Sequence, residues 1–219
     1  MKRIQGLLLA GLLPAAVTLR PAEAREDWRY MSQWVAAHQI SEETSVSLLA
    51  EAYSRDDFTD IYNYDGYLTG TRQLGAGFTL IGQMFLARTK SETGEWTDAA
   101  SAVAGALHTT DIPHVGLLRL QERVYYRLDS PDGWDHHRPR VYLCREFGDW
   151  TLLVSDEMRL DLGGDRARSF FRNRLFATAT WKATDALSIG LGYFRNWDRE
   201  DDGGWCAWNG VQSVVTVRL

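Results

Sequence analysis

Glu157 is the side chain in this sequence whose surroundings suggest chemistry most directly. It stands two residues before Arg159, and Arg140 and Arg174 occur in the segments on either side of it. A carboxylate among guanidinium groups could serve as an acid with a shifted protonation equilibrium. A structural ion pair is the more common use of such an arrangement. We therefore expect Glu157 to pair with at least one of Arg140, Arg159 and Arg174.

A second group of catalytic residue types comprises Ser130, His136 and His137. Serine and histidine can hydrolyse or transfer lipid acyl chains when the histidine activates the hydroxyl. No orienting carboxylate or oxyanion donor can be placed with these three residues, so we interpret them as parts of an exposed loop.

No cofactor or metal is predicted, because the sequence contains no Gly-rich phosphate loop, nucleophile elbow or metal-ligand cluster. The acidic runs at 129–135 and 198–202 could hold divalent cations, but a solvated loop is the more common explanation. Cys144 precedes a tight turn and Cys206 lies in a long loop, so we expect them at opposite ends of the fold and not bonded to each other.

The elements that carry these residues are predicted to be β-strands almost throughout. Apolar and polar residues alternate with period 2 from Glu43 to the C-terminus, and no helical apolar spacing is sustained. Each candidate segment is about as long as the roughly 9 to 11 residues of a tilted membrane strand. The segments are 28–38, 44–55, 60–71, 74–88, 96–108, 114–128, 138–147, 150–162, 168–182, 186–197 and 208–219.

The expected fold is all-β, a single antiparallel transmembrane β-barrel of 10 to 12 strands. Bacterial barrels formed by one chain normally have an even number of strands, so that both termini lie on the same side. The sequence yields eleven segments. We therefore expect one segment before residue 110 to be split, missed or wrongly assigned.

The two faces of the C-terminal strands differ in polarity. One face is apolar and is expected to point outward to lipid, at Leu118, Leu120, Val141, Leu143, Leu152, Val154, Phe171, Leu175 and Leu191. The other is expected to form a polar network in the lumen, at Arg119, Gln121, Arg123, Arg138, Arg140, Glu157, Arg159, Arg172 and Arg174. A soluble sandwich would show the same alternation. Arginine forks suit hydrogen-bonded ion pairs in a confined lumen, and this favours the membrane barrel.

Tryptophans near the ends of segments support the same interpretation. Trp96, Trp150, Trp181 and Trp197 stand where membrane barrels carry their aromatic girdles. At the N-terminus, Lys2 and Arg3 precede an apolar run that ends near the small-residue site Ala22-Glu23-Ala24. This pattern is typical of a secretory signal peptide at residues 1–24, with the barrel in 25–219.

The charge of the exported part argues against nucleic acid as a partner. Removing the leader takes Lys2, Arg3, Arg20 and Glu23 from 24 basic and 29 acidic residues, which leaves a net charge of −7. A nucleic-acid-binding domain would be expected to carry a basic excess instead.

The C-terminal part, roughly residues 74–219, shows a series of short motifs in a fixed order. They are Arg119-Leu120-Gln121-Glu122-Arg123, Arg138-Pro139-Arg140-Val141-Tyr142, Asp156-Glu157-Met158, Asn173-Arg174 and Gly192-Tyr193. In this order the chain resembles domain of unknown function 2490, a family of proteobacterial outer-membrane proteins. Gln121 departs from the more usual acid, and Leu219 stands where outer-membrane barrels often end in an aromatic residue. The resemblance implies a fold and a location but no activity.

The expected function is that of an integral outer-membrane β-barrel of unknown physiological role, without enzymatic activity and with a lumen filled by side chains. The expected location is the cell outer membrane, with outer-membrane lipid and the barrel assembly machinery as partners. Two alternatives stay open: a lipid-modifying barrel enzyme with Ser and His at one rim, and a soluble periplasmic ligand-binding barrel with its apolar face inside.

Overall fold

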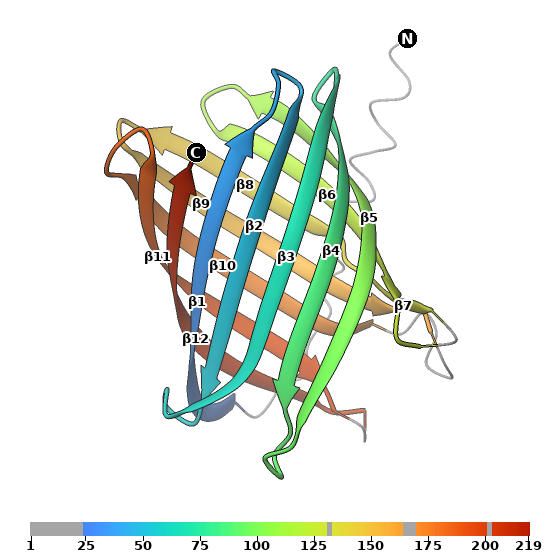
Figure 1. Ribbon diagram of the computed structural model, residues 1–219. Helices are drawn as coiled ribbons and strands as arrows, with labels where there is room; N and C mark the ends of the chain where they lie inside the picture. The colour runs from blue at the N-terminus through green and yellow to red at the C-terminus, as the bar shows by residue number, and fades with distance from the viewer. Residues whose placement is uncertain (1–23, 131–132, 164–169, 201–202) are drawn as a thin grey trace, which may run out of the picture.

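Twelve β-strands form the described part of the chain, residues 24–130, 133–163, 170–200 and 203–219 of a computed structural model (Figure 1). None of the described residues forms a helix long and apolar enough to cross a membrane. The strands are β1 (Ala24–Gln39), β2 (Thr44–Arg55), β3 (Asp60–Gly75), β4 (Phe78–Lys90), β5 (Trp96–Ile112), β6 (Gly116–Arg127), β7 (Trp134–His137), β8 (Arg140–Phe147), β9 (Trp150–Asp161), β10 (Phe170–Lys182), β11 (Leu187–Arg199) and β12 (Trp205–Arg218).

The strands close into a barrel. Consecutive strands pair antiparallel, and the short strands β7 and β8 both lie between β6 and β9, so the wall has eleven strand positions. β1 closes the wall against β12, with Trp34 opposite Val215 in a parallel pair. Closure leaves no unpaired sheet edge. The predicted all-β barrel is confirmed, but the prediction that all its pairs are antiparallel is wrong at this seam.

The odd number of positions corrects the expectation of an even count. All eleven predicted segments correspond to strand positions, so none before residue 110 was wrongly assigned. β1 starts at the lower rim of Figure 1 and β12 ends at the upper rim, so the two ends of the described chain lie at opposite rims. The predicted signal peptide lies outside the described residues except for Ala24.

Local sequence accounts for the tight turn between β3 and β4 at the upper rim. β3 and β4 are joined by Ala76 and Gly77 alone, with φ values of 49° and 80°. Two successive positive φ values define a type I′ hairpin, whose twist matches that of the strands. A Cβ on Gly77 would lie 2.2 Å from the carbonyl oxygen of Thr109, so this turn also needs glycine for its contact with β5.

A proline divides the strand position between β6 and β9. Pro139 has no N–H to donate to the sheet ladder, and it lies between β7 and β8. Hydrogen bonds continue around it: the N–H of Arg138 donates to the carbonyl of Arg123 at 2.7 Å, and the N–H of Met158 donates to the carbonyl of Pro139 at 3.0 Å. The wall therefore remains closed across the break.

The outward face of the wall is apolar. Leu191 on β11 is 69% exposed, whereas Phe194 on the same strand is fully buried inside. The predicted outward residues Leu118, Leu120 and Val141 are half-buried. The exposed apolar side chains of the wall include Leu48, Leu68, Met84, Leu143, Leu152, Val154, Leu175, Ile189 and Leu191.

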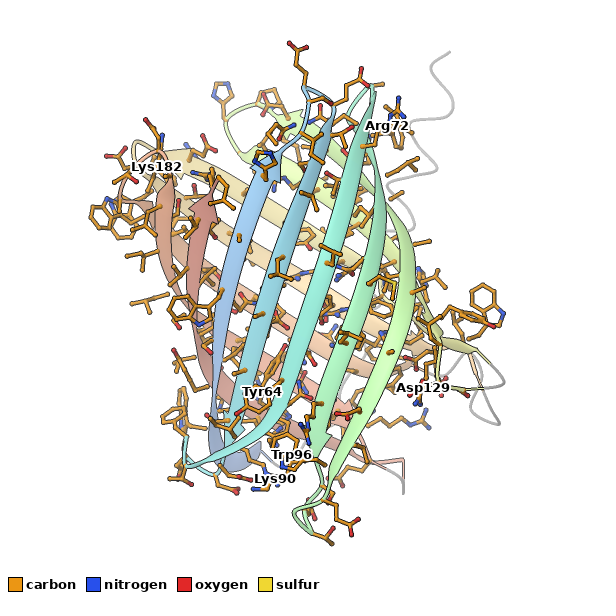
Figure 2. The ribbon with its side chains drawn as sticks, in the orientation of Figure 1. Tyr64, Arg72, Lys90, Trp96, Asp129 and Lys182 are labelled. Atoms are coloured by element: carbon orange, nitrogen blue, oxygen red, sulfur yellow. The ribbon has the colours of Figure 1, made fainter. Side chains whose placement is uncertain are left out.

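Exposed aromatic side chains gather at both rims. Figure 2 shows Tyr64 and Trp96 near the lower rim, where their rings stack at 5.7 Å, and Arg72 and Lys182 near the upper rim. Trp197 is half-buried near the lower end of β11. Exposed rings toward the lower rim include Trp28, Tyr64, Trp96, Tyr126 and Trp134, and those toward the upper rim include Phe78, Phe147, Trp150 and Trp181. Trp34 and Tyr193 are also exposed, but they lie within their strands.

Phe171 is the one predicted outward residue with an interior contact. A bulge between Phe170 and Arg172 interrupts the register of β10 with β9. The Phe171 ring meets the ring of His136 edge-on at 6.3 Å, and His136 is itself 7% exposed. An extra residue in a strand shifts the alternation of faces, and this explains the error.

No disulfide joins Cys144 and Cys206. Cys144 lies on β8 close to the upper rim, and Cys206 is the second residue of β12 at the lower rim. The prediction that they are not bonded to each other is confirmed.

Candidate functional site

The barrel interior is built around Glu157 on β9, which is fully buried. Four guanidinium groups lie within ion-pair distance of its carboxylate. Those of Arg138, Arg140, Arg159 and Arg123 approach at 2.7, 3.5, 3.6 and 3.7 Å. The predicted pairing of Glu157 with Arg140 and Arg159 is therefore present.

Strand register brings these side chains together. Arg140 on β8 and Arg174 on β10 are the direct cross-strand partners of Glu157, one on each side. Side chains that face each other in this way share one face of the sheet. Arg159 follows Glu157 by two residues and therefore points into the same lumen. The alternation of the two faces therefore places Arg140, Arg159 and Arg174 around Glu157 by regular strand geometry alone.

Arg138 reaches the carboxylate from the break between β7 and β8. Arg138 is 6% exposed, and its guanidinium also donates a hydrogen bond to the hydroxyl of Tyr125 at 3.0 Å. The Tyr125 ring is fully buried and stacks on the ring of His136 at 4.1 Å. Arg138 is thus held between a carboxylate and a tyrosine hydroxyl, both on neighbouring strands.

Gly105 on β5 makes room for Arg123 on β6. The two residues are cross-strand partners. A Cβ at position 105 would lie 2.9 Å from Cγ of Arg123 and 2.4 Å from the carbonyl oxygen of Glu122. The glycine therefore allows the Arg123 side chain to lie against the β5 backbone on its way to Glu157.

The remaining predicted network residues lie around this centre. Arg174 is 4% exposed and donates to Oδ1 of Asn196 at 3.1 Å. Arg172 pairs with Asp198 toward the lower rim. Gln121 accepts a hydrogen bond from the Tyr142 hydroxyl at 2.7 Å. Arg119 is half-buried on the same strand, with Nε buried and without a hydrogen-bond partner.

Sequence analysis missed an acidic side chain on the opposite wall. Glu51 on β2 is 8% exposed and accepts hydrogen bonds from the Tyr53 hydroxyl at 2.7 Å and from the amide of Gln33. Asp65 lies on β3, next to β2, and faces the same interior. Glu51 shares its strand face with Ser47, Leu49 and Tyr53, so the alternation that revealed Glu157 could also have revealed Glu51.

A cavity of about 210 Å³ lies between these two walls. Arg138, Arg140 and Arg174 line one side of it and Glu51 lines the other. It extends toward the upper rim, where Thr151 and Thr180 stand close to the ends of β9 and β10. A buried hydrophobic cluster adjoins the cavity and consists of Met31, Tyr53, Phe176, Phe194 and Trp208, of which Met31, Tyr53 and Phe176 also line the cavity.

The histidines do not form the loop that the sequence suggested. His136 and His137 belong to β7, and their side chains lie on opposite faces of the wall. His136 is buried and contacts Asp135 at 3.0 Å, whereas His137 contacts the exposed Glu122 at 2.6 Å. The structure therefore does not bring both histidines to one site with Ser130.

No group of three or more metal-ligating side chains occurs among the described residues. In the lower-rim loop, both carboxylate oxygens of Asp129 accept hydrogen bonds from Arg127 at 2.9 Å. This guanidinium holds the pKa of the Asp129 carboxyl below its ordinary value. Asp129 is thus paired with Arg127, the last residue of the preceding strand β6.

No family model matches the chain, and no curated protein matches it either.

Proposed function

We propose that this chain is an integral β-barrel of a bacterial outer membrane, with a structural and non-enzymatic role and a lumen filled by polar and aromatic side chains. The observation that carries the proposal is the inverted distribution of polarity across the closed wall. Charged groups such as Glu157 and Arg174 are buried inside, while leucines such as Leu191 are among the most exposed side chains.

This distribution fits lipid better than water as the surrounding medium. A soluble barrel would enclose its apolar face and expose its polar one. Here the apolar band lies outside and is bounded at each rim by exposed aromatic rings, as in the girdles of membrane barrels. The predicted signal peptide and the resemblance to domain of unknown function 2490 point to the same location.

Several polar groups on the outer face pair with neighbours on that face, although the Nε of Arg195 is buried without a hydrogen-bond partner among the described residues. Glu122 contacts His137 at 2.6 Å, and Asp156 accepts a hydrogen bond from Asn173 at 2.9 Å. Arg195 lies over the Trp197 ring at 5.3 Å. Ionisable residues within membranes usually pair with one another, and the cost of a charge on the lipid face falls toward the interfaces.

Fractionation of the full chain, expressed in a Gram-negative host, tests the proposal. We expect the protein in the outer-membrane fraction, resistant to extraction by carbonate. Unboiled samples should migrate differently from boiled ones in gel electrophoresis, because a closed barrel stays folded in the detergent until it is heated. Recovery of a folded protein in the soluble periplasmic fraction would contradict the proposal.

A further inference from the structure

The charges around the interior cavity do not balance. Arg123, Arg138, Arg140 and Arg159 all share the single carboxylate of Glu157. Arg174 adds a fifth guanidinium, and it forms no ion pair with any carboxylate in the part of the chain that the structure describes; its Nε donates to the amide oxygen of Asn196. Among the described residues of the far wall, the cross-strand partners Glu51 and Asp65 add negative charge, so five guanidinium groups stand against three carboxylates.

Hydrogen bonding in this cluster is incomplete on both sides, because the two carboxylate oxygens of Glu157 are also buried without a hydrogen-bond partner among the described residues. The Nε groups of Arg123, Arg138 and Arg159 are buried and lack hydrogen-bond partners among the described residues. Buried polar groups are nearly always hydrogen-bonded, and each exception needs a physical explanation, such as local strain, a catalytic role or a bound ion. Guanidinium groups present a fork of donors that matches the oxygens of a carboxylate or a phosphate.

Three arginines of the cluster, Arg138, Arg140 and Arg174, line the cavity and could face a ligand there. The cavity volume is about 210 Å³, and one water needs roughly 10–15 Å³ of such space. Arg140 and Arg174 lie on its wall, and their guanidinium carbons are 4.7 and 5.6 Å from the centre of the Phe176 ring, which fixes both side chains against one surface. Above them the lining is neutral, with Leu153, Thr151 and Thr180 leading toward the upper rim.

We propose that the cavity binds a small carboxylate or phosphate anion, whose oxygens are held by Arg140 and Arg174 and whose remainder lies along the neutral lining. Glu51 is occupied by Gln33 and Tyr53 on the opposite wall, so it restricts the anion to the arginine side. The site belongs to the barrel interior and does not depend on where the barrel is located in the cell.

Calorimetric titration of the folded barrel in a non-ionic detergent tests this site. The probes are inorganic phosphate, butyrate and uncharged 1-butanol. We expect saturable binding of phosphate or butyrate and none of 1-butanol. Binding of phosphate alone indicates a phosphate group as the recognised chemistry, and binding of butyrate alone indicates a carboxylate. Failure of both anions to bind to the wild-type barrel would overturn the proposal.

Two variants locate the binding. Arg174→Gln keeps a donor for Asn196 but removes the charge, and it should weaken anion binding at least about tenfold. Leu153→Trp should abolish binding, because the larger side chain fills the cavity without changing any charge. The control is Arg88→Gln on the outer wall, where Arg88 contacts Asp98 at 3.5 Å; it should bind like wild type. If Arg174→Gln or Leu153→Trp binds the anion as tightly as the wild type and the Arg88→Gln control do, the site is refuted.

Discussion

Glu157→Gln is expected to destabilise the barrel by about 3–5 kcal/mol, the usual consequence of removing one partner from a buried ion pair. The carboxylate is fully buried and lies within 3.7 Å of four guanidinium groups. An amide of the same shape leaves those cations without a counter-charge. The free energy of unfolding in urea, measured for the barrel folded in detergent or lipid, gives the result.

The matched control is Glu146→Gln on β8. Glu146 is exposed close to the upper rim, so the same chemical change should alter stability by no more than about 0.5 kcal/mol. In the double variant Glu157→Gln with Arg138→Gln, part of the lost stability should return, because one uncompensated cation is removed. If Glu157→Gln unfolds at the wild-type urea concentration, the ion-pair cluster does not stabilise the fold.

Leu191→Arg should destabilise the barrel in a bilayer by about 2–4 kcal/mol, the cost of a lipid-facing arginine near the membrane midplane. Leu191 is 69% exposed on the outer wall and lies in the apolar band between the two aromatic rims. In water an exposed leucine can be replaced by arginine at little cost. The effect is therefore specific to a wall that faces lipid.

Val217→Arg is the control for depth. Val217 also faces outward but is the second-last residue of β12, next to the upper rim. There an arginine can reach the interface, and the cost should fall to about 0–1 kcal/mol. Folding into liposomes, followed by heat-modifiable migration and urea unfolding, compares the two variants. Equal stability of both would contradict a membrane-facing position for Leu191.

Strand positions and faces were predictable from the sequence because each follows from local alternation. Arg140, Glu157 and Arg174 were expected on one lumenal face, and they are cross-strand neighbours there. Period 2 in a strand fixes which side chains share a face. It also fixed the outward position of Leu143 and Leu191, which are 38% and 69% exposed.

The way in which the barrel closes was not predictable from local patterns. The parallel pair of β1 with β12 joins residues about 180 positions apart, such as Trp34 and Val215. Nothing in the alternation of either strand specifies its partner at this distance. The expectation of an even strand number came from other barrels and led us to doubt a correct set of eleven segments.

Irregular backbone explains the errors near the site. The strand Trp134–His137 is only four residues long and stands between a polar loop and Arg138-Pro139, so its sequence was interpreted as a loop. The bulge at Phe171 reverses the side on which that ring lies. Both features depend on pairing with neighbouring strands, and bulges carry no strong signal in the sequence of a single strand.

The central claim is tested most directly by measuring how polar the environment is on the outer and on the inner side of the barrel wall. Spin labels at Leu191→Cys on the outer face and Thr178→Cys on the cavity wall, each with Cys144 and Cys206 replaced by serine, report their collisions with oxygen and with a water-soluble nickel chelate in liposomes. We predict that the label at 191 collides mainly with oxygen, which partitions into lipid, and that the label at 178, which the wall separates from the lipid, collides with oxygen much less than the label at 191. A label at 191 that is accessible to nickel and not to oxygen would show that the outer wall faces water, and would contradict the proposed membrane barrel.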